Sequence, residues 1–462
     1  MRDSPTPFSH IAHPSAAGVA MSSFIPVALL LLASCSCERT ETATETDVED
    51  ECTLTSLCDG AVTVQADSTR EPPEPVSIIE GVVSIAVGNL AGTGTPQVYV
   101  GTNTTVTRLD GDDWATATDI WTSNSGDIHP LIAELTGDGV LDLALAIPKS
   151  DDGAGQVVVF PGPVTEPLNW GIEHFELKGS TGSRTGEAIS TADLDADGQV
   201  DLLVDEWVRF GPIDADLPFS ADTDARWLSG EDSVPLGGGA AGDVDGDGLD
   251  DLVFLAARPS TEDECWLMGL ELHVFPGPLS AGSFTMDDAP LTIPLPSDTF
   301  TIIESWLDGR QVQVQDLDFD GVSEIIVGVL DLESPNLYAP AALVYAEPLT
   351  AESQPTERFA LVGHLAAFGD IDGDGYSDLL QADLAASWFL GSIGGVESGP
   401  TLLRGPLDEG SGLDPETCDY PVAEAWSMSP ATAAWTGDLD QDGVNDVVLA
   451  SSDGVRLVLS GE

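Results

Sequence analysis

Short apolar runs alternate with polar turn-forming segments from residue 76 to the end of the 462-residue chain. Typical runs are "DLLVD", "DLVFLA", "EIIVGVL" and "DVVLASS", and the segments between them are rich in Asp, Gly and Pro. Runs of this length bounded by turn residues are typical of β-strands, and no stretch keeps a helical period for more than about two turns. The pattern predicts an all-β protein with many short strands.

A nine-residue acidic motif recurs between these strands. Five copies fit the pattern DxDxDGxxD, with Glu for the last Asp in one of them, and occupy residues 193–201, 243–251, 316–324, 370–378 and 438–446. A weaker copy, "ELTGDGVLD", begins at Glu134, and a degenerate copy, "NLAGTGTPQ", begins at Asn89. One strand leads into each motif, a second leaves it, and a third often ends in a turn such as "FPGP". The repeat therefore predicts a seven-bladed β-propeller of four-stranded antiparallel blades, each of roughly 55 residues.

The two ends of the repeat region predict how the ring closes. Only two strands remain after the last motif, "DVVLASS" and "VRLVLSG", whereas "VSIIEG" at 76–81 is one strand too many before the first motif. We expect this spare strand to complete the last blade, because radial closure covers exposed strand edges.

The acidic motif has the composition of a cation cage. Side-chain oxygens fall at positions 1, 3, 5 and 9, position 7 offers a carbonyl, and Gly at position 6 permits a sharp turn. Calcium accepts six to eight such oxygens, so each copy that carries these carboxylates is a candidate Ca²⁺ site. With five good copies and one weaker copy, we expect about five or six Ca²⁺ ions. The predicted ligands are Asp193, Asp195, Asp197, Gln199, Asp201, Asp243, Asp245, Asp247, Leu249, Asp251, Asp316, Asp318, Asp320, Val322, Glu324, Asp370, Asp372, Asp374, Tyr376, Asp378, Asp438, Asp440, Asp442, Val444 and Asp446, with Glu134, Asp138 and Asp142 as a weaker set.

Two other structures use acidic loops of this kind, the EF-hand and the solvated turn. An EF-hand needs Glu at position 12, where the five good copies have Val204, Phe254, Val327, Gln381 and Leu449. A solvated acidic turn is a reasonable interpretation of one copy but not of five near-identical ones. For the copy at Asn89, which has no carboxylate, we expect a turn without metal.

The loops and their strand context resemble the FG-GAP repeats of integrin α-subunits and of bacterial FG-GAP/VCBS repeat proteins. The resemblance covers residues 76–462, and traces of the family's landmarks survive in "AAFGD" and "ALAIP". It implies that the calcium loop lies between the first and second strands of each blade. It also implies a structural role for the ion and a ligand-binding surface made of loops between blades.

The N-terminal segment predicts export. From Met21 it reads "MSSFIPVALLLLASCSCERTETATETD", with a short apolar stretch followed by Leu32-Ala33-Ser34-Cys35, which resembles the lipobox of bacterial lipoproteins. We expect residues 1–35 to be a signal peptide, Cys35 to be lipidated and Ser36 to direct the protein to the outer membrane or cell surface. An ordinary signal peptide is the alternative. Residues 36–75 predict an acidic, disordered tether.

The remaining five cysteines leave the disulfide pattern open. Cys52 and Cys58 are close enough in sequence for a local disulfide, and Cys265 and Cys418 both lie in polar insertions and form a second possible pair. No CxxC spacing occurs, which argues against a zinc site.

The charge balance excludes polyanionic partners. Fourteen basic residues against 80 acidic ones give a net charge of −66, so neither nucleic acid nor an anionic membrane surface is an expected partner. No GxSxG, HExxH or phosphate-binding loop is present, and the histidines are isolated in the sequence. We predict a monomeric, non-enzymatic, surface-tethered propeller that binds a protein or a glycan. The alternatives are a carbohydrate-active lyase or hydrolase built on the insertions at 256–270 and 405–428, and a purely structural envelope lipoprotein.

Overall fold

The computed structural model describes part of the chain. The described residues are 63–66, 69–70, 74–110, 114–123, 126–150, 153–165, 167–180, 183–216, 219, 224–230, 233–258, 269–296, 299–300, 312–331, 339–360, 364–382, 401–403, 419–422, 424–426, 431–451 and 454–460. All of them belong to one compact unit, which comprises residues 51–260 and 267–462. The predicted signal peptide, the lipobox and all six cysteines lie outside the described residues.

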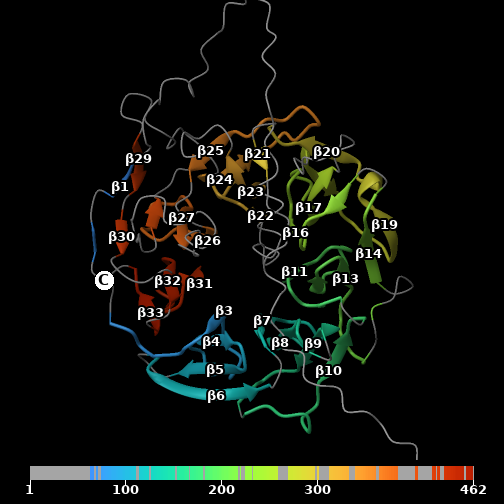
Figure 1. Cartoon of the computed structure of the whole chain (residues 1–462). Coiled ribbons are helices and arrows are strands. Elements are labelled where there is room, and N and C mark those ends of the chain that lie inside the picture. The colour runs from blue at the N-terminus through green and yellow to red at the C-terminus, as the bar shows by residue number, and fades with distance from the viewer. Residues whose placement is uncertain are drawn as a thin grey trace, which may run out of the picture. The chain divides into compact units, whose positions relative to one another are not determined.

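β-strands dominate the described residues, and a 3₁₀ turn, η3 (Met286–Asp288), follows β19. The strands pair into small sheets that follow one another in chain order (Figure 1). The first sheet contains β3 (Val82–Gly88), β4 (Gln97–Thr102), β5 (Thr105–Asp110) and β6 (Thr116–Thr122), and the second contains β7 (His129–Ala133), β8 (Asp142–Ile147), β9 (Gln156–Phe160) and β10 (Phe175–Lys178). The third contains β11 (Ile189–Ala192), β12 (Asp201–Val204), β13 (Trp207–Arg209), β14 (Asp224–Leu228) and β19 (Gly282–Thr285).

The fourth sheet contains β15 (Val234–Pro235), β16 (Ala240–Gly242), β17 (Asp251–Arg258), β18 (Gly269–Phe275) and β20 (Leu291–Pro294). The fifth contains β21 (Thr299–Phe300), β22 (Val312–Gln315), β23 (Glu324–Asp331), β24 (Ala339–Tyr345) and β25 (Glu357–Ala360). The sixth contains β26 (His364–Gly369), β27 (Asp378–Ala382), β28 (Thr401–Leu403), β30 (Glu424–Trp426) and β2 (Thr69–Arg70). A three-stranded sheet follows, with β31 (Ala431–Gly437), β32 (Asp446–Ser451) and β33 (Gly454–Val458), and β1 (Thr63–Ala66) pairs with β29 (Asp419–Val422).

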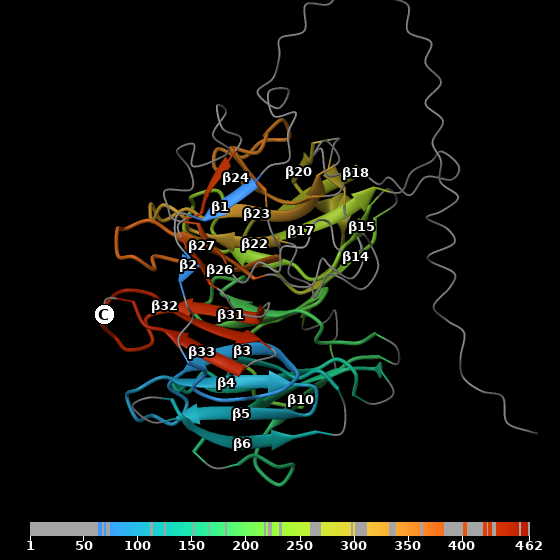
Figure 2. The same ribbon diagram turned by 60° about the vertical axis from the view of Figure 1, so that its left-hand side comes forward.

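Neighbouring strands within the first six sheets are antiparallel, except where β19 and β2 add to the third and sixth sheets as parallel outer strands. The antiparallel order β3-β4-β5-β6 is clear in Figure 2. The strand that leads into each motif, called here the first strand of its sheet, lies toward the centre of the ring, and β31 lies beside β3 (Figure 1). These first strands are β3, β7, β11, β16, β22, β26 and β31. This is the arrangement of a β-propeller.

The hydrophobic core lies between consecutive sheets. The second strands are buried along their whole length in several sheets, as in β8 and β32, which explains their uninterrupted apolar sequences. Six clusters of buried apolar side chains each join two neighbouring sheets. They contain Tyr99 and Leu143, Ala144 and Leu202, Leu203 and Leu252, Val253 and Ile325, Leu380 and Val447, and finally Val448 and Val98. The last cluster brings the two ends of the repeat region together, so apolar packing closes the ring.

The prediction of seven four-stranded blades is wrong in its count. Six sheets have four or five strands and form complete blades, whereas the sheet of β31, β32 and β33 has three. The spare segment at 76–81 does reach this sheet, but it pairs only through an antiparallel bridge between Ser77 and Val455. Val455 N–H donates to Ser77 O (2.8 Å), and Val76 N–H donates to Val455 O (2.9 Å). The fourth strand is thus reduced to one bridge.

The predicted tether also differs from expectation at six described residues. Within 36–75, β1 and β2 form short strands that pair in parallel with β29 and β30. An extended chain supplies unpaired N–H and C=O groups that satisfy those of a sheet edge, which accounts for the pairing.

Candidate metal centres

Each acidic motif forms the loop between the first and second strands of its sheet. The loop at 193–200 joins β11 to β12, and the corresponding loops join β16 to β17, β22 to β23, β26 to β27 and β31 to β32. The structure brings carboxylate oxygens together in all five, with one oxygen of each residue within 4.8 Å of the others. The groups are Asp193, Asp195 and Asp197; Asp243, Asp245 and Asp251; Asp316, Asp318 and Asp320; Asp370, Asp372 and Asp374; and Asp438, Asp440 and Asp446.

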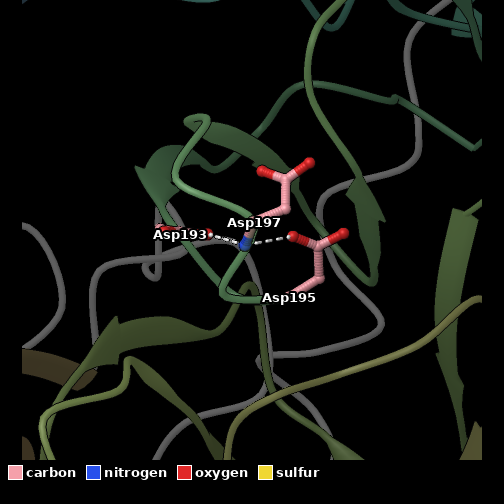
Figure 3. A group of neighbouring side chains, drawn as sticks. All are labelled: Asp193, Asp195 and Asp197. Atoms are coloured by element: carbon pink, nitrogen blue, oxygen red, sulfur yellow. Dashed lines mark hydrogen bonds between the residues drawn. The ribbon is translucent and has the colours of Figure 1, made fainter.

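Backbone N–H groups of the loop bind the carboxylates of positions 1, 3 and 5. In the loop shown in Figure 3, Asp197 N–H donates to Asp193 Oδ1 and to Asp195 Oδ1, both at 3.1 Å. Gly198 N–H donates to Asp193 Oδ2 (3.0 Å), and Gln199 N–H donates to Asp197 Oδ1 (2.8 Å). These bonds wrap the chain around the carboxylates. Burial and the neighbouring carboxylates of Asp197 and Asp193 raise the pKa of Asp195, while the hydrogen bond from Asp197 N–H opposes the rise.

The turn requires a left-handed backbone at positions 4 and 6. Position 6 is Gly in every copy, with φ between 81° and 96°. Position 4 is Gly in four copies, but Ala196, Phe319 and Gln441 hold it at φ of 60° to 67° in the other three. A side chain at such a φ costs about 1 kcal/mol, so these three loops carry some strain.

Position 2 anchors each loop in the core, a role that the sequence reasoning missed. The seven side chains are apolar and at most 7% exposed: Leu90, Leu135, Leu194, Val244, Leu317, Ile371 and Leu439. Their regular spacing between two acidic positions is the sequence signal that identifies them.

Position 9 was predicted as a ligand, and the structure gives it an additional role. Asp201 is fully buried, and its Oδ2 accepts Leu194 N–H (2.8 Å) and Asp195 N–H (3.3 Å), while its Oδ1 accepts Gly211 N–H (2.8 Å). Bonds from the N–H of position 2 recur at Asp142, Asp251, Glu324, Asp378 and Asp446. The position-9 carboxylate therefore braces the loop against the strand that follows it, whether or not it also contacts a cation.

Burial raises the pKa values of several position-9 carboxylates. Desolvation raises the pKa of Asp201 and of Asp251 to about 6, although backbone N–H bonds from the loop and from the next turn oppose the change. Desolvation likewise raises the pKa of Glu324 to about 7 and raises that of Asp446. A nearby divalent cation would favour the ionised form of each.

The turns built on Pro hold the loops from outside. Gly162 N–H and Gly277 N–H donate to the position-9 carboxylates Asp142 (2.8 Å) and Asp251 (2.9 Å), as Gly211 does for Asp201. A Cβ on Gly162 would lie 2.1 Å from the carbonyl oxygen of Leu141, so only glycine fits there. The predicted Gly-Pro turns thus serve as part of the loop architecture.

Hydrogen bonds also connect one sheet to the loop of its neighbour. Val164, Ile213 and Leu279, which follow the Gly-Pro turns, donate their N–H to the position-2 carbonyls of the preceding loops at 2.9, 2.7 and 2.7 Å. Later loops contact each other directly, with Ser323 N–H on Asp243 O (2.6 Å), Ser377 N–H on Leu317 O (3.0 Å) and Asn445 N–H on Asp370 O (3.0 Å). The acidic loops, which together form one rim of the ring, are therefore linked to neighbouring sheets by hydrogen bonds.

The two weaker copies keep the turn with fewer charges. In the copy at Glu134, Asp138 N–H donates to Glu134 Oε1 (2.9 Å) and Val140 N–H to Asp138 Oδ1 (2.8 Å). In the degenerate copy, Thr93 N–H donates to Asn89 Oδ1 (2.9 Å), and Ala91 N–H donates to Gln97 Oε1 (3.3 Å). In the degenerate copy, the uncharged Asn89 and Gln97 thus take the place of the carboxylates at positions 1 and 9 and accept hydrogen bonds of the same type.

A cavity of about 380 Å³ lies among the inner strands β3, β7, β11, β16 and β22. Its lining combines apolar and polar groups in similar measure and includes His129, Glu187 and Asp205. Asp205 accepts Gly186 N–H (2.7 Å) and Ala188 N–H (2.9 Å), and burial raises its pKa to about 7. Its carboxyl group thus holds the backbone that precedes β11. Most of the insertions at 256–270 and 405–428 lie outside the described residues.

No family model and no curated protein sequence matches the chain. Among solved structures, the chain is similar to BBS1N in complex with ARL6DN, with 12% identity and a TM-score of 0.45, covering 86% of this chain and 97% of that one. It is also similar to the V. cholerae biofilm matrix protein Bap1, with 12% identity and a TM-score of 0.41, covering 86% and 91%. An Agrocybe aegerita lectin that recognises non-reducing terminal N-acetylglucosamine gives 13% identity and a TM-score of 0.26, covering 82% and 80%. Similarity at this level assigns no function. Within the described residues, no helix has the length and apolar character needed to cross a membrane.

Proposed function

We propose that the chain is an exported, calcium-stabilised β-propeller of the FG-GAP/VCBS type that is lipid-anchored at the outer membrane or cell surface and binds a protein or a glycan. The observation that carries the proposal is the convergence of three carboxylates in each of five loops between the first and second strands. The set fits calcium, because carboxylate oxygens on a turn with Gly at position 6 are the donors that this cation prefers. Asp193, Asp195, Asp197 and their counterparts would hold the ion.

The residues around these centres determine what the ion would do. Without a cation, three carboxylates within 4.8 Å repel one another, and backbone N–H bonds alone oppose this repulsion. When bound, calcium supplies the missing positive charge. Because neighbouring loops are hydrogen-bonded, each ion would stiffen its own loop and the sheets on either side. Metal bound only by the folded chain stabilises that chain by mass action.

The binding role is supported by the architecture of the rim. Loops from neighbouring sheets are hydrogen-bonded to one another, and a surface built from several such loops would suit a macromolecular ligand better than a small substrate. The described residues do not include most of the two insertions on which the enzyme alternative depends.

A thermal melt with ion counting tests the proposal. The protein is melted with calcium and then with excess chelator, and bound calcium is measured by elemental analysis. We expect five or six ions and a large fall in melting temperature in chelator. No bound calcium and identical melting curves would reduce the loops to acidic turns.

A further inference from the structure

Trp170 is held at the surface on a tight turn. It lies between β9 and β10 and is 52% exposed, and Ile172, two residues later, is 37% exposed. Ile172 N–H donates to Asn169 O (3.0 Å), and Gly171 N–H donates to Asn169 Oδ1 (2.9 Å). Two hydrogen bonds thus fix the four residues that present the indole to solvent.

Two aromatic side chains, Trp121 and His174, pack against this indole and orient it. The ring of Trp121 meets that of Trp170 edge to face with centroids 4.9 Å apart, and His174 does so at 5.3 Å. Trp121 is buried, and His174 Nδ1 is bonded to Ile172 O (2.7 Å). The support is therefore rigid, and Trp170 loses little conformational freedom when a ligand covers its outer face.

The segment that follows Trp170 in the chain is acidic. Glu173 is exposed and makes no ion pair within the described part of the chain, and the exposed Asp216 accepts Glu176 N–H (2.9 Å). Glu176 itself is neutralised by Lys178 at 2.6 Å. An exposed aromatic face is thus followed, three residues along the chain, by an exposed carboxylate without an ion pair among the described residues, on a chain with a net charge of −66.

Elsewhere in the same chain, an aromatic ring and a carboxylate hold an arginine side chain between them. On β13 and β14, the guanidinium of Arg226 lies 4.7 Å from the ring centroid of Trp207 and pairs with Glu206 at 3.2 Å. Arg209 lies 5.3 Å from the ring centroid of Phe219 and pairs with Asp224. Each arrangement combines a ring, a guanidinium and a carboxylate. Trp170 and Glu173 supply the ring and the carboxylate without the cation.

We propose that Trp170 and Glu173 form a docking point for an arginine or lysine side chain in a basic segment of a partner protein. The inference rests on the proposed function and specifies the partner's chemistry. Tryptophan is the best aromatic partner for a cation, and the net negative charge of the chain attracts a basic segment from a distance. The exposed large apolar side chains of this turn are Trp170 and Ile172. Two such side chains are too few for a hydrophobic interface but enough to contact one cationic side chain.

Peptide binding to the calcium-loaded full chain tests this proposal. The probe is a short fluorescent peptide of arginines separated by Gly and Ser, followed by anisotropy at about 0.15 M salt, where long-range attraction is largely screened. Trp170→Ala is expected to weaken binding about tenfold, with Trp170→Phe intermediate, because cation–aromatic contacts strengthen when they are partly desolvated and are strongest with tryptophan. Glu173→Gln is expected to weaken it about threefold.

Matched controls distinguish peptide binding at Trp170 and Glu173 from general attraction to the negative charge of the chain. Glu352→Gln removes one exposed carboxylate elsewhere, Val234→Ala trims another exposed apolar side chain, and both are expected to bind like the parent. A peptide with citrulline in place of arginine is expected not to bind. Equal binding by Trp170→Ala and the parent, or equal losses for Glu173→Gln and Glu352→Gln, would overturn the proposal. Binding of neutral dextran that depends on Trp170 would overturn it in favour of a glycan.

The proposed function has its own readout. Trp170→Ala is expected to keep the parent's calcium count and its calcium-dependent melting shift, because Trp170 lies outside the acidic loops. If the melting shift is absent from the parent as well, the calcium proposal fails independently of the peptide result.

Discussion

Replacing Asp201 separates bracing from ion binding. Asp201→Ala removes the acceptor for three backbone N–H groups, those of Leu194, Asp195 and Gly211. Asp193→Ala, in contrast, removes a partly exposed carboxylate whose two N–H donors, Asp197 and Gly198, lie in an exposed part of the turn. If position 9 is a brace, the first variant should destabilise the protein even without metal, and the second should do so mainly with calcium.

The structure sets the size of the effect. The buried Leu194 N–H costs about 3 kcal/mol when left without an acceptor, and the partly buried N–H groups of Asp195 and Gly211 cost about 1.5 kcal/mol each, so the three together cost about 6 kcal/mol. Removing the buried carboxylate offsets part of this cost, because burial raises the pKa of Asp201 from 3.8 to about 6, equivalent to about 3 kcal/mol at neutral pH. The net loss is about 3 kcal/mol. For a folded region of roughly 390 residues, this corresponds to a melting temperature about 4 °C lower.

The assay is a thermal melt of both variants and the parent in calcium and in chelator. We expect Asp201→Ala to melt about 4 °C below the parent in chelator, and Asp193→Ala to melt within about 1 °C of it. In calcium, Asp193→Ala should bind one ion fewer and lose part of the calcium-dependent shift. The reasoning is refuted if Asp201→Ala matches the parent in chelator, or if the two variants behave alike in both conditions.

Three further predictions follow from the same loops and from the ring closure. Ala196→Gly relieves a left-handed alanine at φ 61° and should stabilise the protein by about 1 kcal/mol in urea unfolding, whereas Gly198→Ala at φ 84° should destabilise it; an opposite ranking would contradict the turn geometry. Raised carboxyl pKa values mean that the folded metal-free chain binds protons more tightly than the unfolded chain, so its melting temperature should fall as pH rises from about 4 to 7, the upper end being set by Glu324 and Asp205; a rise over this interval would contradict the reasoning. A chain that begins at 82 should melt lower than one that begins at 74, because Val455 loses both hydrogen bonds of its bridge to the 76–77 segment; equal melting would mean that the bridge contributes nothing.

The sequence predicted the strands and the loops well because both are local patterns. Buried strands such as β8 and β32 have unbroken apolar sequences, and the acidic motif fixes a turn through its own Asp and Gly residues. The position of the motif between the first and second strands was predicted from the family resemblance and is confirmed.

The rest depends on contacts between distant residues. The bonds of Asp201 to Gly211 and of Ile213 to Leu135 join segments that no local pattern relates, so the brace and the links between sheets could not be predicted. The blade count failed for a similar reason, since pairing of the 76–81 segment with β33 depends on the closed ring. Whether calcium occupies the loops, and whether Cys35 carries a lipid, stay predictions.

The charge-free loop at residues 89–97 shows that the shape of the turn and its ion chemistry are separable. Asn89 and Gln97 reproduce with neutral oxygens the hydrogen bonds that carboxylates make in the other loops. A lineage can therefore add or delete an ion site by changing side chains at Asn89, Ala91, Thr93 and Gln97 while the surrounding sheets stay intact. The number of ions that such a ring carries is a property open to gradual adjustment, in protein design as in evolution.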